Sequence, residues 1–108
     1  MTFPMQITFH QMDRSEALEQ AIQEKAAKLA KFHSSITQLH VAVTCETRHS
    51  STSRQYKVRL DVHVKGKDYA ITRHADEDAF VAARDAFEAA RRILDEDIET
   101  RRGSVKQH

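Results

Sequence analysis

The sequence has little of what disulfides, irregular loops and membrane segments need. Its 108 residues include one cysteine, one proline, two glycines and no tryptophan. The lone Cys45 cannot form an internal disulfide, and there is no CxxC or Cys/His spacing of the kind that binds zinc. No apolar run approaches the ~18 residues that a membrane helix needs, and the N-terminus has no secretory pattern. We expect a cytoplasmic protein without a membrane partner, built mostly of regular secondary structure.

An excess of one charge is also lacking. Seventeen Lys and Arg residues stand against sixteen Asp and Glu, so the formal net charge is +1. Taken alone, this total argues against a nucleic-acid partner, but the distribution of charge over the faces matters more than the sum. The length corresponds to one domain, which we place at residues 1–100, followed by a flexible C-terminal tail at 101–108.

Hydrophobic periodicity predicts the elements. Apolar and polar residues alternate in four segments, which predicts strands at 5–10, 39–46, 56–65 and 69–73, the last two joined as a hairpin. A first helix is predicted up to Phe32, with Asp13 as N-cap and Glu16 completing a capping box. A second helix is predicted to begin near Asp76 or Glu77.

This order, β-α-β-β-β-α, predicts an α+β fold of the double-stranded-RNA-binding-domain type. Each predicted strand has one apolar face and each helix one apolar stripe, so a four-stranded sheet with two helices packed on one face is the simplest solution. The other sheet face would be open to water, and the helices would form a ridge and a groove. In this pattern six aromatic residues take core-facing positions: Phe9, Phe32, Tyr56, Tyr69, Phe80 and Phe87.

Basic residues border both helical stripes. With ~100° per residue, Lys25, Lys28 and Lys31 form a ladder along one edge of the first stripe. Arg84 and Arg91 border the second stripe, and Arg92 follows. One interpretation is a solubilising edge, with the arginines paired to nearby acids such as Glu88 and Asp95. The other is a surface that binds phosphates, for which the arginine fork is well suited.

Catalytic and metal chemistry have weak support. His10, His40 and His63 fall on the polar parity of their strands, while His33, His49 and His74 lie at element ends or in loops; we expect all of them to be exposed and not to bind metal. Cys45 has the inward parity of a small core residue. We therefore predict no enzyme activity, no cofactor, no metal and no small-molecule substrate.

Three segments resemble one known family, the ribosome hibernation promoting factors, also called ribosome-associated inhibitors or ribosome-subunit interface proteins. They are the strand MQITFH from Met5, the helix segment AIQEKAAKLAKF from Ala21, and DAFVAARDAFEAARRIL from Asp78. The resemblance covers residues 5 to about 98 and includes the order of the elements. The second helix is more acidic than is usual in the family, with Asp85, Glu88, Asp95, Glu96 and Asp97.

The resemblance implies a function that composition does not. Family members bind the small ribosomal subunit and its rRNA in the mRNA/tRNA channel, through basic helix faces, and inhibit translation in stationary phase or stress. Lys25, Lys28 and Lys31 match the family's first helix and Arg92 its second, whereas Arg84 and Arg91 are assigned on geometry. The chain is similar to the short forms, with a natural end expected at His108, so it would either need a second factor for ribosome dimerisation or act on single ribosomes. A general double-stranded or regulatory RNA binder, and a protein-interaction module using the open sheet face, stay as alternatives.

Overall fold

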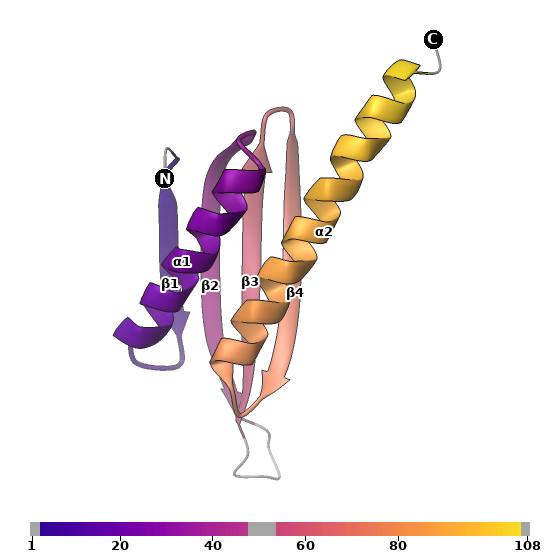
Figure 1. The fold of residues 1–108 in the computed structure, drawn as a ribbon. Helices are drawn as coiled ribbons and strands as arrows, with labels where there is room; N and C mark the ends of the chain where they lie inside the picture. The colour runs from indigo at the N-terminus through magenta and orange to yellow at the C-terminus, as the bar shows by residue number, and fades with distance from the viewer. Residues whose placement is uncertain (1–2, 48–53, 107–108) are drawn as a thin grey trace.

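The computed structural model describes residues 3–47 and 54–106 and gives the chain two layers (Figure 1). Its elements run in the predicted order, which confirms the α+β class. They are β1 (Met5–His10), α1 (Glu16–Phe32), β2 (Ile36–Thr47), β3 (Arg54–Val64), β4 (Lys67–Asp76) and α2 (Ala79–Lys106). No helix in these ranges is both long enough and apolar enough to cross a membrane.

The sheet has the strand order β1-β2-β3-β4. β1 and β2 are parallel, with α1 as the connection between them, and the other two pairs are antiparallel. The register aligns Ile7 with Val41, Val41 with Leu60, and Leu60 with Ile71, so one apolar row crosses the whole sheet. Because side chains alternate between faces along a strand, this register gives the sheet one apolar and one polar face.

Both helices cover the apolar face, as predicted (Figure 1). The core consists of strand residues such as Leu39 and Leu60 together with Ile22 of α1, all fully buried. Cys45 is also buried, which confirms its place as a small core residue. α2 packs on β3 and β4 and runs on past the edge of the sheet (Figure 1).

α1 begins two residues later than predicted. Ser15, in an extended conformation, is the N-cap, and its hydroxyl accepts a hydrogen bond from the Leu18 backbone N–H at 3.2 Å. The predicted capping box of Asp13 and Glu16 is therefore wrong, because serine and aspartate cap equally well and the chain enters the helix at Ser15. Just before the cap, the exposed Arg14 donates to Glu19, and this hydrogen bond raises the pKa of the guanidinium.

α2 also begins later than predicted. Asp76 still belongs to β4, and Glu77 takes a left-handed conformation with φ 59° that turns the chain. Asp78 then caps the helix, since its carboxylate accepts from the backbone N–H groups of Phe80 and Val81 at 2.9 and 3.3 Å. The prediction of a start at Asp76 or Glu77 is wrong because Asp76 ends a strand that is longer than its periodicity indicated, and Glu77 forms the turn that follows it.

The C-terminal boundary differs as well. α2 stays helical to Lys106, past the limit expected near Arg101. The flexibility predicted for residues 101–108 stays a prediction. The predicted hairpin is confirmed, with a two-residue turn at Lys65 and Gly66 in which Gly66 has φ +84°.

Two aromatic residues predicted to lie in the core are exposed instead. Phe32 is 54% exposed and Phe80 is 47% exposed. Phe32 is the last residue of α1, and Phe80 lies in the first turn of α2. The helical wheel placed both on the apolar stripe, but the buried position in the last turn of α1 is taken by Leu29, and that in the first turn of α2 by Ala79.

Candidate nucleic-acid interface

A groove of about 260 Å³ lies between the two helices. α1 lines it with Lys25, Lys28, Leu29 and Phe32, and α2 lines it with Arg84, Phe87, Glu88 and Arg91. Four of the six basic residues predicted as a site are therefore brought together, with one acid among them. Lys31 and Arg92 are exposed but do not line the groove.

The lysine ladder follows from the helical repeat. Residues three positions apart lie on neighbouring parts of one helix face, so Lys25 and Lys28 project together beside the buried Leu29. Lys25 is half-buried, as expected for a stem that lies along apolar surface with its ammonium group in water. Within residues 3–47 and 54–100, whose side chains are described, none of the three lysines forms an ion pair, so their charges are available to an external anion.

The arginines of α2 are differently placed. Arg84 donates to the adjacent Asp85 at 3.2 Å, and Arg91 Nε lies 3.9 Å from Asp95 Oδ2. The arginines are thus paired to neighbouring acids, as the interpretation of a solubilising edge predicted for part of this surface. These pairs are about half exposed, and such pairs contribute only about 0–1 kcal/mol, so an incoming phosphate can compete for the guanidinium groups.

Phe32 completes the groove. The Arg91 guanidinium carbon lies 3.9 Å from the centre of the Phe32 ring, a cation–π contact between the last residue of α1 and the middle of α2. Helical periodicity assigns this ring to the core, so Phe32 is a site residue that was not predicted. The sequence signal for its role is its position directly after Lys31 and four residues after Lys28, at the end of the lysine ladder.

His33 is the second missed residue. It is 3% exposed, and its Nε2–H donates to Asp95 Oδ1 at 2.8 Å; the proton lies on Nε2 because an ionised carboxylate only accepts. The prediction that His33 is exposed is therefore wrong. This bond fixes the C-terminal end of α1 against α2, and so fixes the two basic edges relative to each other.

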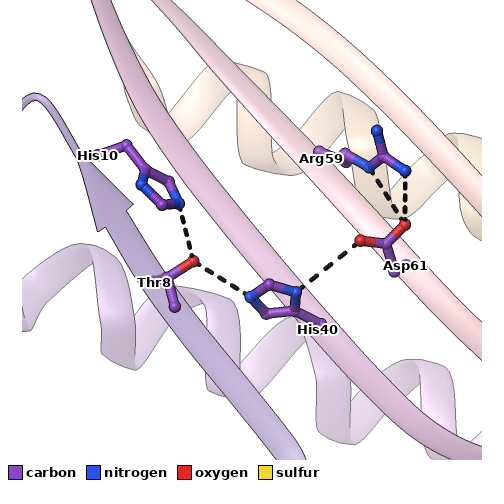
Figure 2. Close-up of polar contacts among 5 residues, drawn as sticks. All are labelled: Thr8, His10, His40, Arg59 and Asp61. Atoms are coloured by element: carbon purple, nitrogen blue, oxygen red, sulfur yellow. Dashed lines mark hydrogen bonds and ion pairs between the residues drawn. The ribbon is translucent and has the colours of Figure 1, made fainter.

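The opposite sheet face carries a polar cluster (Figure 2). The Thr8 hydroxyl lies 3.3 Å from His10 Nε2 and 3.1 Å from His40 Nε2. His40 Nδ1 lies 3.8 Å from Asp61 Oδ2, and Arg59 donates to the other oxygen of Asp61 at 3.1 Å. The predicted polar parity of the strand histidines is thus confirmed.

Charges on this open face are paired with one another. Besides Arg59 and Asp61, His63 Nδ1 donates to Asp68 at 2.6 Å, and Lys57 lies 3.9 Å from Glu46. His74 is exposed, as expected, whereas His49 lies outside the described residues. Across the described ranges, no group of three or more His, Cys, Asp or Glu side chains could hold a metal ion. The three lysines of the first helix, in contrast, form no ion pair with any described side chain.

Comparison with solved structures supports the fold. A ribosomal subunit interface protein from Coxiella burnetii superposes with a TM-score of 0.76 at 14% identity, over 90% of this chain and 99% of that one. The N-terminal domain of Thermus thermophilus Protein Y gives a TM-score of 0.63 at 12% identity, over 82% of this chain and 91% of that one. At these identities the likeness shows a shared architecture. No curated protein sequence matches the chain significantly.

A family model gives the assignment that structural likeness cannot. The model described as Sigma 54 modulation protein / S30EA ribosomal protein matches residues 5–102, which includes all four strands, α1 and most of α2. The match extends over both basic helix edges and the groove between them. The chain therefore belongs to the Sigma 54 modulation protein / S30EA ribosomal protein family, and the predicted resemblance to the ribosome hibernation factors is confirmed.

Proposed function

We propose that this protein is a cytoplasmic, ribosome-associated hibernation factor that binds the small ribosomal subunit in the mRNA/tRNA channel and inhibits translation in stationary phase or stress. Family membership supports association with the ribosome. The observation that carries the proposal is the groove between α1 and α2, where four basic side chains converge from two helices.

The charges of this face suit rRNA phosphates. Lys25, Lys28 and Lys31 form no ion pair within the described side chains, and they supply mobile ammonium groups at one helical edge. Arg84 and Arg91 face them across the groove with planar groups that can bind a phosphate through two N–H donors. Arg92 extends the basic edge outside the groove. The near-neutral total charge is then the sum of this face and acidic residues elsewhere.

Inhibition in this proposal is steric. The protein occupies space that mRNA or tRNA needs, held by charge-assisted contacts, and no covalent step, cofactor or small-molecule substrate is required. Because each phosphate that is neutralised releases counterions, binding should weaken steeply as salt rises. A second factor for ribosome dimerisation stays a prediction of the family resemblance.

The test is co-sedimentation with purified small subunits. Replacing Lys25, Lys28 and Lys31 together by Glu should abolish it. A control carrying Lys57→Glu, Lys65→Glu and Arg73→Glu makes the same change in net charge away from the groove and should still bind. Equal loss in both variants would show that net charge alone matters and would overturn the assignment of the site.

Two further outcomes address the alternatives. Binding to naked duplex RNA as tight as to intact subunits would indicate a general double-stranded RNA binder. Capture of a defined protein partner that is insensitive to salt and is lost on substitutions of the open sheet face would indicate a protein-interaction module. The proposed function predicts neither result.

A further inference from the structure

Phe32 is an exposed aromatic ring at the end of a basic groove. Slightly more than half of the residue is accessible, although the larger apolar residues earlier in the helix, Leu18, Ile22 and Leu29, are buried. The Arg91 guanidinium covers part of the ring at 3.9 Å. Aromatic rings and guanidinium planes beside cationic surfaces are the groups on which proteins stack unpaired bases.

Phe32 lines two hollows. On one side lies the groove already described, to which Arg91 belongs. On the other lies a smaller hollow of about 200 Å³ at the end of α1, which Phe32 also lines but Arg91 does not. Arg91 covers one part of a residue that is 54% exposed, so Phe32 keeps accessible surface beside the second hollow.

The second hollow has the wrong chemistry for a phosphate. Its walls include Leu94 and Ile98, its polar groups include Ser34, Ser35 and Asp97, and no Lys or Arg lines it. The Asp97 carboxylate, which lies 3.6 Å from Lys67 Nζ, would repel an anion. An apolar wall, an aromatic ring and a polar rim suit a flat, uncharged heterocycle such as a nucleobase.

We propose that this hollow binds an unpaired nucleobase, which stacks on Phe32 while Lys25, Lys28 and Arg91 hold flanking phosphates. The inference rests on the proposed function for its nucleic-acid partner and adds to it a contact with a base. The partner strand must be unpaired at this point, because a base inside a duplex has no free face.

The test uses a fluorescent heptanucleotide RNA and an abasic strand of equal length and charge, titrated at several salt concentrations. Wild-type protein should bind the strand with bases more tightly. Phe32→Ala should weaken that binding by about 5- to 150-fold, leave abasic binding unchanged and leave the salt dependence unchanged, since no charge is removed. Phe32→Tyr should restore binding. Phe80→Ala, at a similarly exposed ring outside both hollows, is the matched control and should have no effect.

Combining Phe32→Ala with Arg91→Gln distinguishes base stacking from a role in which Phe32 only positions Arg91. If the ring only holds Arg91 in place, Phe32→Ala should have no further effect in the Arg91→Gln background, which would overturn the proposal. Stacking predicts that the loss from Phe32→Ala persists there. The proposal would also be overturned if the wild-type protein bound both strands equally well or bound neither strand. Failure of the proposed function is a different result, namely no co-sedimentation with small subunits whatever the strands show.

Discussion

The carboxylate of Asp95 accepts a hydrogen bond from the buried His33, 62 residues earlier in the chain, at 2.8 Å. The same carboxylate lies 3.9 Å from Arg91 Nε on its own helix. One acidic side chain thus joins the cap of α1 to the basic edge of α2. An acid that appears unfavourable for a phosphate-binding helix has a structural role, because it fixes the spacing of the two helices that line the groove.

We expect Asp95→Ala to destabilise the fold by about 1–3 kcal/mol, since it leaves the buried Nε2–H of His33 without an acceptor. Urea denaturation monitored by circular dichroism measures this change. Asp85→Ala, which breaks only the exposed pair with Arg84, is the control and should change stability by less than about 1 kcal/mol. A His33→Ala, Asp95→Ala double variant whose losses simply add would contradict the coupling of the two residues.

The exposed Phe32 should contribute less to the stability of the fold than a core residue does. Leu60 is fully buried, so Leu60→Ala should lower the free energy of unfolding by about 2–5 kcal/mol. Phe32→Ala should cost clearly less, because over half of the residue is already in water. A loss at Phe32 as large as that at Leu60 would mean that the ring is part of the core, as its periodicity alone indicates.

A lysine that lines the groove should contribute more to binding than a lysine that lies outside it. Lys28 lines the groove and Lys31 does not. Lys28→Gln should therefore weaken binding to small subunits more than Lys31→Gln does. It should also reduce the slope of log affinity against log salt by about one unit, as expected for one lost phosphate contact. Equal effects at the two positions, measured by titration at three or more salt concentrations, would argue for a diffuse basic surface.

Glu88 is the one acid that lines the groove. Removing its charge by Glu88→Gln should strengthen binding to small subunits by about two- to fivefold, equal to ~0.4–1 kcal/mol, because the carboxylate opposes the incoming phosphates across a solvated gap. Glu96→Gln, at an exposed position of α2 outside the groove, is the matched control. Weaker binding in the Glu88 variant would show that this carboxylate positions a basic neighbour instead.

The sequence predicts local order well and long-range placement poorly. Alternation locates all four strands because each has one buried face, and it places Cys45 inside and His40 on the open face. The choice of Ser15 over Asp13 as the cap depends on where the backbone turns, which propensity does not decide. The ends of β4 were underestimated because its edge alternates less cleanly than its centre.

Parts of the site had no local signal. His33 follows a helix and precedes two serines, a pattern typical of an exposed connection. It is buried because α2, whose register is set far along the chain, passes over it with Asp95. Phe32 has the spacing of the core stripe but is exposed at the last residue of α1. The basic ladder could be predicted, whereas its division into groove and non-groove residues required the crossing of the helices.

The central claim is that the basic helical face occupies the path of mRNA and tRNA on the small subunit. The most direct measurement is binding to purified small subunits at low salt, with increasing tRNA and a short mRNA as competitors. The proposed function predicts that they displace wild-type protein, and that the Lys25, Lys28 and Lys31→Glu variant does not bind at all. Binding that is undiminished at saturating tRNA and mRNA would contradict the claim.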